Sequence, residues 1–352
     1  MSFLISRFVF RIVLIAAGLS QASTAMAQTD DQLRKWCFGD ATDDQTIQGC
    51  ESVIKAGKEP TANLANVFFN RGTSYVNKAQ YDRAIQDYDQ AIKLNPNYAA
   101  AFAMRGSAND SKGQYDRAIQ DYDQAIKLDP NDARAFYNRG LSYAHKGQYD
   151  RAIQDYDQAI KLNPKFAPAF TNRGFSYAHK GQYDRAIQDY DQAIKLNPNL
   201  AEAFNNRGSA YDNKGQYDRA IQDYDQVIRL NPNYADALYN RGLSYAHKRQ
   251  YDRAIRDFDQ AITLNPNNAI AFYNRGYAYD EKDQYDRAIR DYDQAIKLDP
   301  NDAVFFNGRG VSYAKKGQYD HAIQDYNQAI KLDPNYATAL SNRADAIAKK
   351  KK

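Results

Sequence analysis

Two cysteines are the residues of this 352-residue chain that could most directly do covalent chemistry, Cys37 and Cys50. They could close a disulfide, hold a metal ion or act as a redox pair. A structural metal site usually needs more than two ligands, and a redox pair usually has the spacing CxxC, which is not found here. The sequence therefore predicts a Cys37–Cys50 disulfide, which requires an oxidising compartment.

Three of the four histidines could bind a metal ion, because they recur in register. His145, His179 and His247 occupy equivalent positions of a repeated segment, but only the first two belong to adjacent copies. A cation near a helix C-terminus is the simpler interpretation, since the helix dipole favours it there. His321, the fourth, replaces an arginine of the repeat. We therefore predict no metal and no other cofactor.

The motifs of common enzyme active sites are missing from the sequence. There is no HExxH, GxSxG or GxxxxGK[ST], and no GxGxxG after a strand-like segment. The abundant Asp and Arg residues recur in every copy of the repeat, as structural charges do. We therefore predict that the protein is not an enzyme, and a non-catalytic subunit of an enzyme complex is a further alternative.

A repeated phrase, QYDRAIQDYDQAIKLNP, determines where these residues lie, and it stands at 80–96, 148–164 and 182–198. Near copies continue the same interval of 34 residues, beginning at Gln114, Gln216, Gln250, Gln284 and Gln318. The apolar residues of the phrase follow the spacing of one helix face, in one copy Tyr149, Ala152, Ile153, Tyr156, Ala159 and Ile160. The phrase is therefore a helix that ends before its proline.

The other half of each unit, residues 133–146 in one copy, is a second helical segment. Phe136, Gly140 and Tyr143 share one face, and a helix-stop glycine follows. Glycine in mid-helix predicts a close approach of the partner helix, where Ala152 is also small. Each hairpin is too short to bury its aromatic residues alone, so the hairpins are predicted to stack, with the tyrosines mainly in the core.

The order of these residues resembles the tetratricopeptide repeat. In one unit the matching residues are Phe136, Gly140, Tyr143, Ala152, Tyr156, Ala159 and Pro164. The resemblance implies an all-α fold, a right-handed α-solenoid of helix-turn-helix units. Eight units are predicted at 65–336, followed by a C-terminal capping helix with a lysine tail at 337–352. Residues 46–55 align without gaps with 84–93, so 28–64 is predicted to be a degenerate N-terminal cap stapled by the disulfide.

One column of the repeat, meaning the equivalent residues of successive units, departs from the family pattern. Arginine precedes the glycine where the family usually has an apolar residue, at Arg71, Arg105, Arg139, Arg173, Arg207, Arg241, Arg275, Arg309 and Arg343. A charge on the packed face requires a carboxylate. Helical spacing directs Asp155 and Asp223 toward it, so we predict the ion pairs Arg139–Asp155 and Arg207–Asp223 and expect Asp157 to point elsewhere. A ladder of substrate-binding arginines is the alternative.

The N-terminus predicts export. Two arginines precede the apolar run 12–19, and the small-residue site Ala25-Met26-Ala27 follows it, as in a secretory signal. The run is too short for a membrane anchor, so residues 1–27 are predicted to be a cleaved signal peptide. We expect a periplasmic or secreted protein that is not inserted in a membrane after cleavage.

The charge of the chain argues against two classes of partner. The 47 Lys and Arg residues nearly balance the 43 Asp and Glu residues, and the net charge is +4. Nucleic acids and anionic membranes usually require a concentrated basic face, which near-neutral repeats do not provide. We therefore predict a protein or peptide as the partner, and no nucleic acid.

The first helices of the units differ from copy to copy, whereas exposed residues of the second helices, such as Asp157 and Gln158, barely change. By resemblance, the variable columns and an asparagine column beside them face a concave groove that binds extended peptides or helices. The predicted groove residues are Tyr137, Asn138, Leu141, Asn172, Phe175, Asn206, Tyr239, Asn240, Leu243, Tyr273, Asn274 and Tyr277. We predict an extracytoplasmic interaction scaffold, and a passive spacer of the cell envelope is the alternative.

Overall fold

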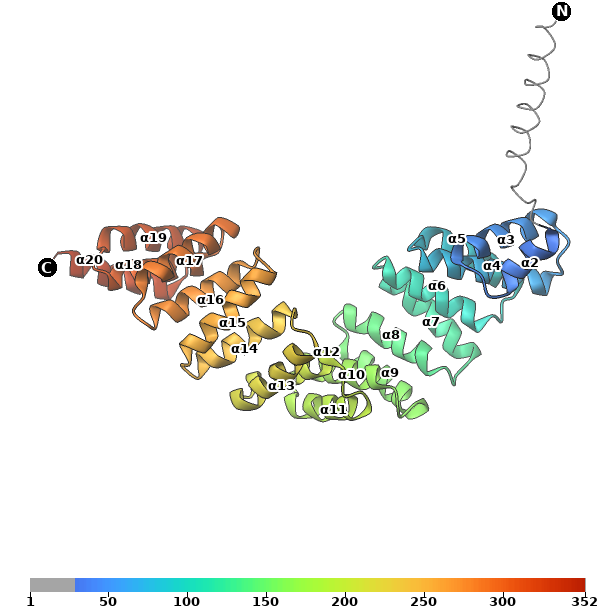
Figure 1. Cartoon of the computed structure of the whole chain (residues 1–352), viewed down its shortest axis with the longest axis horizontal. Coiled ribbons are helices and arrows are strands. Elements are labelled where there is room, and N and C mark those ends of the chain that lie inside the picture. Colours follow the sequence, from blue (N-terminus) through green and yellow to red (C-terminus); the bar gives the residue numbers. More distant parts are fainter. Residues whose placement is uncertain (1–28, 352) are drawn as a thin grey trace, which may run out of the picture. The chain divides into compact units, whose positions relative to one another are not determined.

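The computed structural model of the protein describes residues 29–351, and every regular element in that range is an α-helix (Figure 1). The predicted signal peptide at 1–27 lies outside the described residues. Within residues 29–351, no helix is long and apolar enough to cross a membrane. The all-α fold predicted from the sequence is confirmed.

The chain divides into two compact units, residues 1–148 and 149–352. The described part of the first unit contains α2 (Asp30–Phe38), α3 (Asp43–Ala56), α4 (Thr61–Asn77), α5 (Tyr81–Leu94), α6 (Ala99–Ser111), α7 (Tyr115–Leu128) and α8 (Ala133–His145). The described part of the second contains α9 (Tyr149–Leu162), α10 (Ala167–His179), α11 (Tyr183–Leu196), α12 (Ala201–Asn213), α13 (Tyr217–Leu230), α14 (Ala235–His247), α15 (Tyr251–Leu264), α16 (Ala269–Asp280), α17 (Tyr285–Leu298), α18 (Ala303–Lys315), α19 (Tyr319–Leu332) and α20 (Ala337–Lys350). From α4 onward, even-numbered helices are the first helices of the repeats and odd-numbered helices are the second.

The helix ends follow the signals expected from the sequence, with one exception. First helices stop before a left-handed residue, such as Gly181 with a φ of 71°, and second helices stop at the leucine before the Asn-Pro or Asp-Pro pair. Arg249 replaces the glycine of this column and still adopts a φ of 57°. The exception is α4, which begins at Thr61, about one turn earlier in its repeat than the other first helices begin.

One aromatic ring from each second helix forms the centre of its hairpin. Tyr224 is 1% exposed, and a Cβ added at Gly208 would lie 2.8 Å from its ring. In the next hairpin, Phe258 lies 2.7 Å from the corresponding position at Gly242. The close approach of the partner helix is also present, since the Ala186 carbonyl oxygen lies 3.1 Å from a Cβ added at Gly174, but the nearest atoms belong to the ring.

The prediction that the phrase's tyrosines are mainly core residues is correct for one column and wrong for two. The column of Tyr156 is fully buried wherever it holds tyrosine. Tyr143 and Tyr149 are only half-buried, and so are nearly all of their equivalents. A side chain at these two columns lies at the edge of the hairpin, where its ring packs and its hydroxyl reaches the surface.

We expect Gly208→Ala to destabilise the protein by about 1–2 kcal/mol. The added methyl group would force the Tyr224 ring to move, and overpacking of this kind outweighs the gain of about 1 kcal/mol in helix propensity. Denaturant unfolding measures the change. Ala344 holds the same column in α20, where no described helix follows, so Ala344→Gly serves as the control and should cost about 1 kcal/mol. A stabilised Gly208→Ala variant would contradict the prediction.

Candidate functional site

The arginine column lies between the two helices of each hairpin and is neutralised there. Nε of Arg207 donates to Oδ2 of Asp223 at 2.9 Å, and Nη2 donates to Oδ1 at 2.6 Å. The guanidinium also lies 5.5 Å from the centre of the Phe204 ring. Arg207 and Asp223 therefore form a bidentate ion pair, as predicted from the helical spacing.

Most arginines of the column also reach a carboxylate of the preceding repeat. Nη1 of Arg173 donates to Asp157 at 2.6 Å, so Asp157 pairs with the arginine of the following repeat, a contact that the sequence did not predict. The same double pairing is made by Arg105, Arg173, Arg207, Arg241, Arg275 and Arg309. These six guanidinium groups are occupied on both sides, which argues against the alternative that they bind an anionic substrate.

The pair Arg139–Asp155 cannot be treated in the same way, because the two residues belong to different compact units. Within the first unit, Nη1 of Arg139 donates to Asp123 at 2.6 Å, which repeats the contact to the preceding repeat. The predicted contact with Asp155 stays a prediction.

Burial and hydrogen bonding together set the pKa values of these pairs. Burial raises the pKa of the Asp223 carboxyl, and the hydrogen bonds from Arg207 lower it only in part. Burial also acts to lower the pKa of Arg207, but hydrogen bonding to Asp223 and its charge outweigh this and raise the pKa. The arginine is thus held in its charged form, as a structural cation must be.

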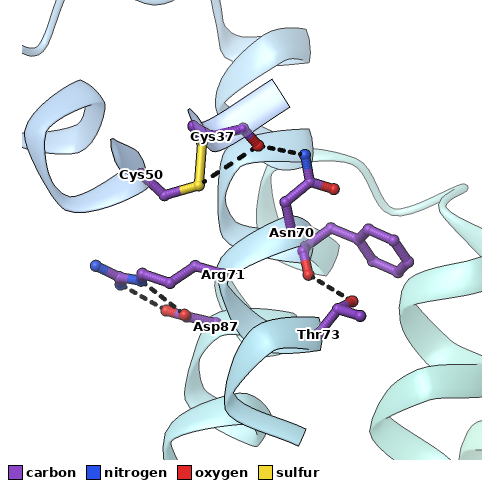
Figure 2. The surroundings of a disulfide bond; sticks show 7 residues. Cys37, Cys50, Asn70, Arg71, Thr73 and Asp87 are labelled. Atoms are coloured by element: carbon purple, nitrogen blue, oxygen red, sulfur yellow. Dashed lines mark hydrogen bonds and ion pairs between the residues drawn. A yellow bond between two sulfur atoms is a disulfide. The ribbon is translucent and has the colours of Figure 1, made fainter. Parts of the chain in front are cut away.

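The N-terminal cap is closed by a disulfide and contacts the first repeat beside it (Figure 2). Cys37 and Cys50 are joined, with their Cα atoms 4.7 Å apart. The side-chain amide of Asn70 donates to the Cys37 carbonyl oxygen at 2.9 Å, so the asparagine column here serves the cap. Arg71, the next residue, pairs with Asp87 on α5.

The three histidines in register are stacking partners. The ring of His179 lies 4.9 Å from that of Tyr149 with an interplanar angle of 11°, and His247 lies on Tyr217 in the same way at 4.8 Å. Each histidine therefore packs on a tyrosine of the preceding repeat, a contact that the sequence analysis missed in favour of the helix dipole. Among residues 29–351, no group of three or more His, Cys, Asp and Glu side chains could hold a metal ion.

The predicted groove residues all lie on first helices. Tyr137, Asn138 and Leu141 are on α8 of the first unit, and the other nine are on α10, α12, α14 and α16 of the second. Two aromatic side chains among them are exposed to an unusual extent, Phe175 at 39% and Tyr277 at 44%. Four further exposed apolar residues on first helices were not predicted from the sequence, Ile270, Val304, Leu340 and Ile347.

Two cavities lie at equivalent places on the first helices of the second unit. The first, of about 350 Å³, lies between α10 and α12 and is lined by Phe175, Ala178, His179 and Asn206, among others. The second, of about 440 Å³, lies between α14 and α16 and is lined by the equivalent Leu243, Ala246, His247 and Asn274. Volumes of this size are typical of ligand pockets. The alanine column that lines both cavities, with Ala178 and Ala246, was not among the predicted groove residues.

A buried polar cluster takes the place of that alanine at other interfaces. Ser244 of α14 donates to Asp212 of α12 at 2.7 Å, and the Tyr224 hydroxyl donates to the same carboxylate at 2.8 Å. Burial raises the pKa of Asp212, and the hydrogen bond from Ser244 opposes the rise. The sequence carries a signal that could have revealed the cluster, because each aspartate of this column is followed 32 residues later by serine, in the pairs Asp110–Ser142, Asp212–Ser244 and Asp280–Ser312.

Four models of the tetratricopeptide repeat match the chain. One matches residues 65–98, 133–166 and 269–302, and another matches 205–269. The other two match 87–120, 155–188 and 291–324, and 111–147, 176–215 and 312–351. Together these matches run without a gap from residue 65 to residue 351. The chain belongs to the tetratricopeptide repeat family.

Solved structures agree with this family assignment. A tetratricopeptide repeat protein from Parabacteroides merdae is 21% identical with a TM-score of 0.54, over 71% of this chain and 98% of its own length. The C-terminal part of a repeat protein from Cytophaga hutchinsonii is 22% identical with a TM-score of 0.55, over 67% and 97%. A structure of the APC/C hetero-tetramer Cut9-Hcn1 is 18% identical with a TM-score of 0.57, over 87% of this chain and 60% of the other. At these identities the likeness shows the solenoid fold alone.

The comparison with curated proteins finds no match to the chain. The family itself gives a coarse function, because tetratricopeptide repeat proteins are typically non-catalytic scaffolds for protein–protein interaction. Two features of this member set limits on where a partner can bind. Six of the arginines are occupied inside the hairpins, and two of the cavities lie between neighbouring first helices, whereas three others lie at the starts of second helices.

We expect Arg207→Ala to cost about 3 kcal/mol, because it leaves the Asp223 carboxylate, with a side chain only 6% exposed, without its partner. Denaturant unfolding measures the cost. The double variant Arg207→Leu with Asp223→Leu should be far milder, since no buried charge is left alone. Arg343 of the same column has a described hydrogen bond only to Asn327, so Arg343→Ala is the control and should cost less than about 1 kcal/mol. Equal costs for the two single variants would refute the buried-pair account.

We expect reduction of the disulfide to lower the stability of the cap by about 2–4 kcal/mol, because the short loop between the cysteines loses its constraint. Hydrogen exchange should accelerate in α2 and α3 and stay unchanged in α13, since contacts in a solenoid are local. Asn70→Ala, which keeps the disulfide and removes one hydrogen bond to the cap, is the control and should cost only about 1 kcal/mol. Unchanged exchange in α2 after reduction would show that the disulfide does not hold the cap.

Proposed function

We propose that the protein is a non-enzymatic, extracytoplasmic scaffold that binds a polypeptide partner along the first helices of its repeats. This surface, called here the groove face, consists of the columns of Tyr137, Asn138 and Leu141. The proposal keeps the predicted domain limits, with a signal peptide at 1–27, a disulfide-stapled cap at 28–64, eight repeats at 65–336 and a capping helix at 337–352.

The observation that carries the proposal is the pair of cavities on the groove face of the second unit. Phe175 and Tyr277, the two most exposed of the predicted aromatic anchors, each line one of them. Aromatic side chains provide a large contact area at a small cost in conformational entropy, and a few such residues commonly dominate an interface. Exposed rings beside ligand-sized cavities therefore favour binding.

The asparagine column supports the same proposal only in part. Asn274 donates to the Tyr239 hydroxyl at 2.9 Å and to the Ile270 carbonyl oxygen at 3.0 Å, so its amide group is engaged inside the protein. Asn70 is engaged by the cap. Asn206, by contrast, has no described hydrogen-bond partner and lines a cavity. The asparagines that serve a ligand are thus a subset of the column.

The uniform second helices are explained by contacts between repeats. Asp157 and Asp150, both in the repeated phrase, pair with Arg173 and Lys180 of the following repeat. Their constancy is therefore required by contacts between repeats. The groove face is then the part of the repeat that is free to vary, as expected for a surface that recognises a ligand.

The proposed compartment rests on two independent features. The pattern of residues 1–27 is that of a secretory signal, and Cys37 and Cys50 form a disulfide. Structural disulfides persist in oxidising compartments and are rare in the reducing cytosol. Both features agree with a periplasmic or secreted protein.

We expect Phe175→Ala with Tyr277→Ala to weaken peptide binding at least tenfold while leaving helical content and melting temperature nearly unchanged, because both rings are largely exposed. The probe is a phage-displayed library of random twelve-residue peptides selected on the parent protein, with affinities measured by calorimetry. Gln158→Ala with Gln192→Ala, on exposed positions of the second helices, is the matched control and should bind as the parent does. Failure to select any peptide, or equal affinity of the groove variant, would overturn the proposal.

A further inference from the structure

The cavity between α10 and α12 exposes a hydroxyl group that has no described partner in residues 29–351. Tyr190, 1% exposed, lines this cavity, and no hydrogen bond joins its hydroxyl to any described residue. In the same column, Tyr224 donates to Asp212 and Tyr292 donates to Asp280. The difference has a local cause, because the column of Asp212 holds Ala178 in α10. The Tyr190 hydroxyl is therefore free to exchange a hydrogen bond with a ligand in this cavity.

The amide group of Asn206 is a second hydrogen-bonding group available in this cavity. Its equivalent Asn274 is held by the hydroxyl of Tyr239 from the preceding first helix. The residue of α10 equivalent to Tyr239 is Thr171, whose hydroxyl donates to the Ala167 carbonyl oxygen of its own helix. Asn206 therefore has no described partner, and it can both donate to and accept from a ligand.

The walls of the cavity are aromatic and carry no fixed charge. His179 stacks on Tyr149, and the Phe175 ring meets its edge at 4.3 Å and 60°. Tyr183 donates to the neutral side chain of Asn213 at 3.3 Å. The cavity between α14 and α16 differs, since Arg249 and Glu281 line it. A charged ligand group would find no opposite fixed charge in the α10–α12 cavity, so an uncharged group is favoured.

We propose that the α10–α12 cavity is a specificity pocket for one uncharged, hydrogen-bonding side chain of the groove ligand, with tyrosine as the best match. The proposal rests on the proposed peptide-binding function. A phenol ring fits the aromatic walls, and its hydroxyl can exchange hydrogen bonds with Tyr190 and Asn206. The volume of about 350 Å³ accommodates such a side chain. Phenylalanine would leave both protein groups unpaired, so the pocket rejects it.

The test is a double-mutant cycle between the protein and its selected peptides. Peptides selected from the twelve-residue phage library on the full-length protein should share tyrosine, or another uncharged hydrogen-bonding residue, at one position. Tyr190→Phe and Asn206→Ala should each weaken binding of such a peptide at least fivefold. The same substitutions should leave the affinity of the peptide's Tyr→Phe analogue unchanged, because the hydrogen bonds are then already lost.

Two further variants separate the pocket from general effects on folding. Tyr224→Phe removes a hydroxyl of the same column that is already bonded to Asp212, and it should leave peptide affinity unchanged. Ala178→Asp with Ala210→Ser copies the Asp212–Ser244 pair, which this fold already accommodates, into the pocket. That variant should melt like the parent and lose its preference for tyrosine over phenylalanine.

The outcomes distinguish this inference from the function on which it rests. Peptides that depend on Phe175 and Tyr277 but bind Tyr190→Phe and Asn206→Ala as tightly as the parent would overturn the pocket and retain the groove. Selected peptides with apolar or charged residues at the shared position would do the same. If no peptide is selected at all, the pocket and the groove both fail.

Discussion

A guanidinium group inside each hairpin is the constraint on which the rest of the molecule depends. Arg207 can stay buried between α12 and α13 only because Asp223 of its own repeat and Asp191 of the preceding one neutralise it. Substituting Asp223 would disturb the arginine of its own repeat. Substituting Asp191 would disturb the arginine of the next repeat. The pattern YDRAIQDYDQ is therefore fixed by contacts within repeats and between them. This coupling explains why the phrase recurs with so few changes.

The two helices of each repeat therefore have different roles. Second helices supply the buried ring, the aspartates for the arginine column and the carboxylates that pair with lysines of the next repeat, such as Asp184 with Lys214. Few of their positions are free to vary. The first helices satisfy the packing with their arginine, glycine and alanine, and they leave other columns open to change. Differences between repeats, and with them any recognition of a particular ligand, are confined to the groove face.

The sequence predicted the hairpins and the ion pair that joins their two helices, although not which tyrosine columns are buried. Helical periodicity gave the hairpins and the direction of Asp223, and the cysteine positions gave the disulfide. Contacts between neighbouring repeats could not be predicted in this way, because helix periodicity does not determine how one hairpin packs on the next. The contact of Asp157 with Arg173, the stacking of His179 on Tyr149 and the Asp212–Ser244 bond all belong to this class. The early start of α4 was not visible in the repeat spacing, because α4 is 17 residues long whereas α6 and α8 have 13.

The contacts between repeats also set the spacing at which the second unit presents its cavities. The α10–α12 and α14–α16 interfaces have Ala178 and Ala246 at the position where α12–α14 and α16–α18 have Asp212 and Asp280, each bonded to a serine of the next first helix. The open and bonded interfaces therefore alternate from α10 to α18. Neighbouring helices pack about 10 Å apart, so equivalent points two repeats apart are separated by about 20 Å. An extended chain advances about 3.3 Å per residue, and about six residues cover that distance. A peptide that fills both cavities thus needs anchors about six residues apart, one in a neutral pocket and one beside Arg249 and Glu281.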